Sequence, residues 1–283
     1  MTSKVLSVIV TSYNYEKFIK TTIENLLNQT RKDFEIIIID DGSSDTSVEI
    51  IQSYSSTYPE LIFIQHPDKK NHGLAASVKL AIEHCTGDFV AFCESDDYWH
   101  EKHVETLCTF LDLHPEASIV FNKLEVINNS SNEEYDCYVS SSNQFLKENS
   151  GKNIFSYLTS NPMPTFSSAC IRRDLLNECD YNSVIRPYLD FWLWRQLCLH
   201  HPIHFADECI TFWRKHDESY DMKEHVRNID DFIMASNNLL LSQTIEKFSW
   251  FERLALSLLK KIRKKSYLKK QIKLLNNLIA RGY

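Results

Sequence analysis

The sequence is poor in glycine and proline and has no long apolar run. Its 283 residues include only 5 Gly and 7 Pro, which excludes collagen-like and other repetitive fibrous chains. The longest apolar stretches, such as LSVIV and EIIII, are far too short to span a bilayer. With 43% hydrophobic and 24% charged residues, the composition is that of a chain with a folded core, not of a disordered one.

The eight cysteines show neither metal-binding nor disulfide spacing. They stand at positions 85, 93, 108, 137, 170, 179, 198 and 209, and no two of them form a C-x-x-C pair. Several lie in apolar strings, such as Cys93 in FVAFC. We therefore expect buried free thiols in a reducing compartment, and the cytoplasm is the predicted location.

Strand and helix patterns alternate through the first half of the chain. Short apolar runs predict strands at 5–10, 34–39, 61–65, 89–93 and 118–126. Between them, apolar residues at helical spacing predict helices near 18–27, 46–54, 74–85 and 104–111. This order predicts an α/β fold in which a mostly parallel sheet carries helices on both faces. Residues 128–151 are rich in Ser, Asn and charge and predict a long loop or a boundary between domains.

Polar clusters follow three of the predicted strands, at residues 11–14, 40–45 and 94–97. In a sheet of this kind, ligands bind at the carboxyl ends of the strands. We therefore expect the three clusters, which are far apart in the sequence, to meet at one edge of the sheet.

Two of these clusters contain adjacent aspartates, Asp40-Asp41 and Asp96-Asp97. Their carboxylates would repel one another and any phosphate unless a divalent cation lay among them. Turn chemistry alone also places Asp, Gly and Ser after strands. Two Asp-Asp pairs at equivalent strand ends nevertheless favour a site for Mg²⁺ or Mn²⁺ and a nucleotide.

The sequence lacks the common glycine-rich nucleotide motifs. No G-x-G-x-x-G follows the first strand, which disfavours a dinucleotide oxidoreductase. No G-x-x-x-x-G-K-[ST] is present, which disfavours a P-loop phosphotransferase. The stretch VTSYNYEKF stands where a sugar nucleotidyltransferase would carry a glycine-rich loop.

Three segments, SVIVTSYNYEKFI, EIIIIDDGSSD and GDFVAFCESDDYW, together resemble family 2 of the glycosyltransferases, whose fold is called GT-A. The resemblance is strong over residues 4–126 and weaker over 160–220. It implies a nucleotide-sugar donor, a divalent metal, and transfer with inversion at the anomeric carbon. A metal is suited to this reaction because the leaving nucleoside diphosphate develops charge that must be neutralised.

The resemblance also implies roles for residues of the first half. Thr11 and Tyr13 would lie against the ribose and the base of the nucleotide. Asp41 would accept a hydrogen bond from a uracil-type imide nitrogen. Asp96 would contact ribose and metal, and Asp97 would bind the metal that bridges the diphosphate.

The chain departs from the family pattern after Gly73. Family members often carry an Arg-Asn pair where this sequence has Val78 and Lys79. Lys79 would still reach a phosphate as a point charge. The change leaves room for a member that does not catalyse transfer.

Two segments of the second half extend the resemblance. YLDFWLWRQL is similar to the family's acidic segment before an aromatic helix, which implies that Asp190 is the catalytic base; the alternative is a helix N-cap. Trp192 and Trp194 would either stack on a sugar acceptor or pack in the core. FWRKHDES is similar to the family's basic loop, so Arg214 and His216 would contact the diphosphate or the metal; the alternative is an ordinary surface loop.

The charge is divided unevenly along the chain. Residues 245–283 hold 11 Lys or Arg and 2 Asp or Glu, so this tail carries +9 and the rest carries −16. An acidic body argues against nucleic acid as its ligand. In the tail, apolar positions at helical spacing from Trp250 to Ile262 precede KKIRKKSYLKK. This pattern predicts an amphipathic segment that either lies on an anionic membrane or packs on the body.

Together these patterns predict a nucleotide-sugar-binding half at 1–127, an acceptor-binding part at 128–220 and a helical basic tail at 221–283. The predicted function is metal-dependent, inverting transfer of a sugar, with a UDP-sugar favoured, to a hydroxyl of a glycan or lipid-linked saccharide in polysaccharide or glycoconjugate synthesis. The protein would be cytoplasmic or peripheral on the cytoplasmic face of the membrane. The alternatives are a nucleotide-binding scaffold without turnover and a membrane-surface adaptor that acts through its tail.

Overall fold

The computed structural model describes residues 6–128, 136–140, 142–154, 165–181 and 188–216. The predicted tail, including Trp250, lies outside these ranges. The first half contains the strands β1 (Leu6–Ser12), β2 (Glu35–Asp40), β3 (Leu61–Gln65) and β4 (Phe89–Phe92) and the helices α1 (Ile19–Leu27), α2 (Ser47–Ser55), α3 (Leu74–His84) and α4 (His103–Leu113). The strands and helices expected in this half are thus confirmed, with ends shifted by a few residues.

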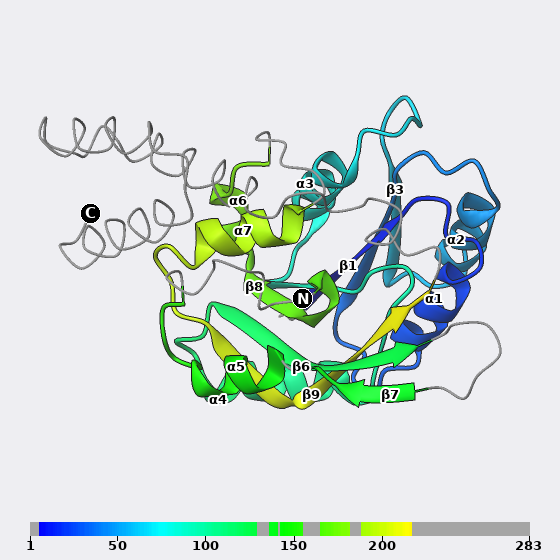
Figure 1. Ribbon diagram of the computed structural model, residues 1–283. Helices are drawn as coiled ribbons and strands as arrows, with labels where there is room; N and C mark the ends of the chain where they lie inside the picture. Colours follow the sequence, from blue (N-terminus) through cyan, green and yellow to red (C-terminus); the bar gives the residue numbers. More distant parts are fainter. Residues whose placement is uncertain (1–5, 129–135, 141, 155–164, 182–187, 217–283) are drawn as a thin grey trace, which may run out of the picture.

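A single mixed sheet runs through the described part of the chain, in the order β3-β2-β1-β4-β8-β6-β9-β5 (Figure 1). Strands β3, β2, β1 and β4 are parallel, as expected for repeated β-α-β units. The other strands are β5 (Tyr98–Trp99), β6 (Ile119–Asn128), β8 (Ala169–Arg172) and β9 (His204–Lys215). Strand β8 is antiparallel to β4 and β6, β5 is antiparallel to β9, and β6 and β9 are parallel. The sheet is therefore parallel in its first half and mixed in its second.

Helices cover both faces of the sheet, because alternate residues of its central strands point to opposite sides. Ile37 and Ile39 of β2 pack in one buried cluster, and Ile36 and Ile38 in the other. The first cluster includes residues of α3, α6 (Arg173–Glu178) and α7 (Leu189–Leu197), which lie together in Figure 1. The second includes residues of α1, α2 and α4. The EIIII run is thus buried on both sides, as a central parallel strand requires.

The expectation of a continuous long loop at 128–151 was wrong. The segment contains β7 (Asp136–Val139), which pairs with β6, and α5 (Ser142–Glu148). The polar side chains of α5 hide its helical pattern in the sequence. One of them, Asn143, is bound to the backbone of Leu124: its Oδ1 accepts the N–H at 2.9 Å, and its Nδ2 donates to the C=O at 2.8 Å. Leu146 on the same helix is 1% exposed.

The structure describes the side chains of seven of the eight cysteines. All seven are free thiols, and six of them are buried, as expected. Within the described ranges, the helices are too short or too polar to cross a bilayer.

Candidate functional site

The three polar clusters meet at the carboxyl ends of β1, β2 and β4. The N–H of Asp41 donates to the carbonyl of Ser12 at 2.8 Å. The N–H of Asn14 donates to Oγ of Ser43 at 2.8 Å. The Ser95 hydroxyl donates to the carbonyl of Thr11. These contacts confirm that segments far apart in sequence share one edge of the sheet.

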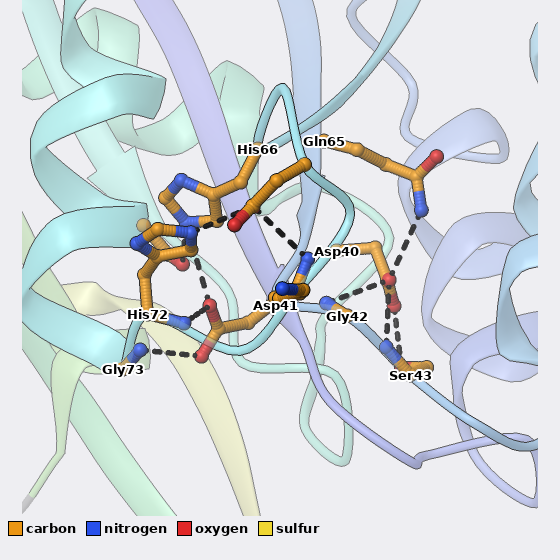
Figure 2. Close-up of polar contacts among 11 residues, drawn as sticks. Asp40, Asp41, Gly42, Ser43, Gln65, His66, His72 and Gly73 are labelled. Carbon is orange, nitrogen blue, oxygen red and sulfur yellow. Dashed lines mark hydrogen bonds and ion pairs between the residues drawn. The ribbon is translucent and has the colours of Figure 1, made fainter.

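Asp40, at the end of β2, holds the turn that follows it. Its side chain is fully buried, and its Oδ1 accepts the N–H groups of Gly42 and Ser43 at 3.1 and 2.9 Å (Figure 2). Gly42 has a φ of +79°, and a Cβ there would lie 2.6 Å from the carbonyl carbon of Lys70. The turn therefore needs glycine both for its backbone conformation and for the close approach of the loop before α3.

Asp41 faces the start of α3 and not the turn. Its Oδ1 accepts the N–H of His72 at 2.8 Å, and its Oδ2 accepts the N–H of Gly73 at 2.9 Å (Figure 2). Nε2 of His66 lies 3.4 Å from Oδ1. Asp41 is 6% exposed, so the carboxylate predicted to read the base also anchors the loop at 66–73.

Asp96 joins the loop after β4 to the end of β9. Its Oδ2 lies 3.1 Å from Nε2 of His216, and the two side chains are 15% and 7% exposed. The hydroxyl of Tyr15 also hydrogen-bonds to Asp96; burial first, and then the negative charge of Asp96, raises the pKa of Tyr15. The ring of His216 packs on Phe18 with centroids 4.2 Å apart. Sequence reasoning missed Tyr15, although it stands in the SYNY segment that carries Tyr13.

Asp97 points away from solvent and is fully buried. Its Oδ1 accepts the N–H of Arg214 at 2.9 Å, whereas its Oδ2 has no hydrogen-bond partner. Burial, followed by the charges of Asp96 and Glu94, raises the pKa of Asp97 well above its usual range. A buried carboxylate oxygen without a donor is costly, and three acids crowd together here.

These acids fit a divalent cation that also binds a substrate. Within the described ranges, no three His, Cys, Asp or Glu side chains are arranged to hold a metal by themselves. Mg²⁺ and similar hard cations commonly take only one or two protein carboxylates and complete their shell with substrate phosphates and water. The unsatisfied Oδ2 of Asp97 and the more exposed Asp96 are suited to such a shared site.

The remaining predicted nucleotide contacts differ in exposure. Tyr13 is 46% exposed, so its ring is accessible for stacking, while Thr11 is partly buried. The guanidinium of Arg214 lies 5.3 Å from the ring centres of both Phe18 and Tyr98, which fixes its direction. The side chain of Arg214 is thus held near two aromatic rings at the end of β9.

Val78 and Lys79 of α3 point in different directions. Lys79 is exposed, whereas Val78 is 1% exposed. Val78 lines a small apolar cavity under the site together with Ile9, Thr11, Phe92, Cys93, Glu94 and Phe166.

Asp190 lies in the first turn of α7, whose N-cap is Tyr188. The residue keeps some exposed surface, but protein surrounds its carboxyl group, whose Oδ1 accepts the N–H of Phe191 at 2.6 Å. Burial raises the pKa of Asp190 to about 7. Trp192 and Trp194 are 1% and 0% exposed, which favours packing over sugar stacking for both.

Comparison with known proteins places this site in a family. The protein-family model described as glycosyl transferase family 2 matches residues 7–180 of the chain. The chain belongs to glycosyltransferase family 2. Similar chains include glycosyltransferase GlyA of Streptococcus pneumoniae, 33% identical over 102 residues that make up 36% of this chain and 14% of that protein. The chain thus spans well under half the length of the curated relatives that it matches.

Solved structures confirm the GT-A fold expected for a family 2 glycosyltransferase. S. aureus TarS 1–349 in complex with UDP-GlcNAc has a TM-score of 0.62 at 22% identity, covering 94% of this chain and 70% of that one. The mannosyltransferase PcManGT of Pyrobaculum calidifontis, in complex with GDP-Man and Mn²⁺, has a TM-score of 0.55 at 14% identity, covering 98% and 86%. At these identities the likeness establishes the fold.

Proposed function

We propose that this family 2 protein transfers a sugar from a nucleotide donor, a UDP-sugar first of all, to an acceptor hydroxyl with inversion, and that the reaction depends on Mn²⁺ or Mg²⁺. The observation that carries the proposal is the meeting of Asp96, Asp97 and His216 at the sheet edge that also holds Asp41. The nucleotide-sugar complexes of TarS and PcManGT, one of them with Mn²⁺, support the same class of donor.

The donor would lie along this edge. Tyr13 would stack on the base and Thr11 would lie beneath the ribose. Asp41 would accept a hydrogen bond from an N–H of the base. Asp96, Asp97 and His216 would hold the divalent cation, which neutralises charge on the diphosphate when bound. Arg214, fixed between two rings, would donate to the same phosphates.

Asp190 would be the base that takes the proton of the acceptor hydroxyl. A carboxylate with a pKa of about 7 has a higher proton affinity than an ordinary aspartate yet is ionised at mildly alkaline pH. The N–H of Phe191 holds it in place. Attack by the activated hydroxyl on the anomeric carbon would displace the nucleoside diphosphate in one step, so no covalent glycosyl-enzyme would form.

The acceptor would be a glycan or a lipid-linked saccharide. The basic tail supports a lipid-linked acceptor, because each Lys or Arg adds about 1 kcal/mol of attraction near an anionic leaflet. This would place the protein on the cytoplasmic face of a membrane. Binding to anionic vesicles that is released by high salt would support this part of the proposal. Salt-independent solubility without any vesicle binding would contradict it.

A thermal-shift panel tests the donor. UDP-, GDP- and dTDP-sugars are each added with and without Mn²⁺, and the donor should raise the unfolding temperature only with the metal. Release of nucleoside diphosphate, with or without acceptor, would then distinguish an enzyme from a scaffold that binds without turnover. Failure of every nucleotide sugar to stabilise the protein would contradict the proposal.

A further inference from the structure

The imidazole of His66 is buried against Asp41 at the end of β3. His66 is 6% exposed, and its Nε2 lies 2.9 Å from Oγ of Ser77 and 3.4 Å from Oδ1 of Asp41. Its ring stacks on that of His72, with centroids 4.3 Å apart and planes at 30° (Figure 2). His72 in turn contacts Oδ1 of Asp68 through Nε2 at 2.8 Å.

The chemistry of the two groups fixes where the proton of His66 lies. An ionised carboxylate can only accept hydrogen bonds, whereas a serine hydroxyl can accept or donate. The contact with Asp41 is therefore favourable only if Nε2 of His66 carries a proton. In this tautomer the N–H points between Oγ of Ser77, at 2.9 Å, and Oδ1 of Asp41, at 3.4 Å, and the serine hydroxyl accepts.

The contacts of Asp41 leave few acceptor positions open. A carboxylate oxygen has about two lone-pair sites. Oδ1 accepts the N–H of His72 and faces Nε2 of His66 at 3.4 Å, while Oδ2 accepts one bond, from Gly73. The rotation of the carboxylate is thereby fixed, and one acceptor direction remains on Oδ2.

We propose that His66 is a positioning residue for nucleotide recognition: its Nε2–H holds the carboxylate of Asp41 so that Oδ2 presents a single acceptor to the base. The inference rests on the proposed function and deepens it. A base with an imide N–H, such as uracil, satisfies that acceptor. Cytosine has a ring nitrogen without a hydrogen at the corresponding position, and the lone pair of this nitrogen repels the carboxylate. His66 thus contributes to the choice of base without touching the nucleotide.

Two substitutions distinguish the effect of the N–H donor of His66 from the effect of its aromatic ring. H66Q keeps an N–H donor near the position of Nε2 but removes the aromatic ring. H66F keeps the ring that stacks on His72 but removes the donor. S77A serves as a control, because it removes the second partner of Nε2 and leaves the contact with Asp41. The dissociation constants of UDP and of CDP are measured by calorimetry with Mn²⁺ for the wild type and all three variants.

We expect H66F to bind UDP about tenfold more weakly, as loss of one charge-assisted hydrogen bond predicts, while its affinity for CDP is unchanged. H66Q and S77A should keep the UDP preference of the wild type to within about threefold. The inference is overturned if H66F retains the preference. It is also overturned if H66F and H66Q lose affinity for both nucleotides in parallel, because the packing of the ring would then be what matters. If the wild type binds neither UDP nor CDP, that result contradicts the proposed function itself and, with it, this inference.

Discussion

Nε2 of His216 lies 3.1 Å from Oδ2 of Asp96 and so joins the end of β9 to the loop after β4. The adjacent acid, Asp97, stabilises the same junction, because its Oδ1 accepts the N–H of Arg214 on β9. Two adjacent carboxylates therefore have different tasks. Asp96 is the more exposed of the two, whereas Asp97, besides its proposed contact with the cation through Oδ2, ties down through Oδ1 the strand that delivers His216.

The first prediction concerns Asp96. Its replacement by Asn keeps the shape of the side chain but removes the negative charge that a divalent cation requires. We expect Asp96→Asn to weaken Mn²⁺-dependent binding of UDP by about tenfold to a hundredfold, with little change when the metal is absent. Calorimetric titration with UDP, in Mn²⁺ and in chelator, measures both values.

A matched control for Asp96→Asn is Asp88→Asn, which removes an exposed carboxylate just before β4. It changes the net charge equally and should leave both affinities unchanged. Equal UDP affinity of Asp96→Asn and the wild type in Mn²⁺ would show that Asp96 does not hold the metal.

The second prediction concerns the stability of the metal-free protein at Asp97. The pKa of Asp97 is raised well above 3.8 in the folded state, so above pH 4 the folded chain keeps a proton that the unfolded chain has released. The folding stability of the wild type therefore falls as the pH rises from the unfolded pKa towards the folded pKa, because the buried carboxyl group must be ionised at a cost that the unfolded chain does not bear. Asp97→Asn carries no charge at any pH. In chelator at pH 8 it should be about 1–3 kcal/mol more stable than the wild type, and this advantage should shrink at pH 4–5.

Urea unfolding at pH 5 and pH 8 measures this difference. The same experiment with Mn²⁺ and UDP should reverse the order, because only the wild type gains the stabilisation of a bound metal and nucleotide. Parallel pH profiles of the two proteins in chelator would contradict the raised pKa.

The first half of the fold was predictable because its pattern is strong and local. The EIIII run has the signature of a central parallel strand, and α3 shows a clear apolar stripe. The second half was harder, because β8 has only four residues and pairs on both sides with strands distant in sequence. Such pairings leave no periodic trace, so the antiparallel strands of the mixed sheet were not anticipated.

Within the site, the acids and the segment of Arg214 and His216 were recognisable in the sequence, but which side chain contacts which acid was not. Asp40, Asp41, Asp96 and Asp97 follow strands, and strand ends can be read from the sequence. Tyr15 and His66 matter through contacts with carboxylates that the fold, not the sequence, brings near. The division of tasks between adjacent acids also depends on side-chain direction, which no spacing of residues encodes.

The third prediction concerns Asp190 and pH. The proposed base must be ionised to accept a proton, and its pKa is about 7. Below that pH the rate constant kcat should fall by about tenfold per pH unit, while UDP affinity measured over the same range changes much less. Asp190→Asn should abolish transfer and still bind UDP with Mn²⁺ as the wild type does. Normal transfer by Asp190→Asn, or a flat rate between pH 5 and 8, would remove Asp190 from this role.

The fourth prediction concerns Val78, which stands where family members often carry arginine. Val78 is 1% exposed and lines a small, mostly apolar cavity, so an arginine there would bury its charge in too little space, with Glu94 as the one acidic residue of the lining. We expect Val78→Arg to lower the free energy of unfolding by about 3 kcal/mol or more, measured by urea denaturation.

Lys79→Arg is the control: its side chain is exposed on the same helix, and its effect should stay within about 0.5 kcal/mol. A Val78→Arg protein that is as stable as the wild type and binds UDP more tightly would show that the site still accepts the family's arginine. The expected loss would show instead that the apolar packing under this site has adapted to valine, so that any phosphate contact on this side must come from another residue.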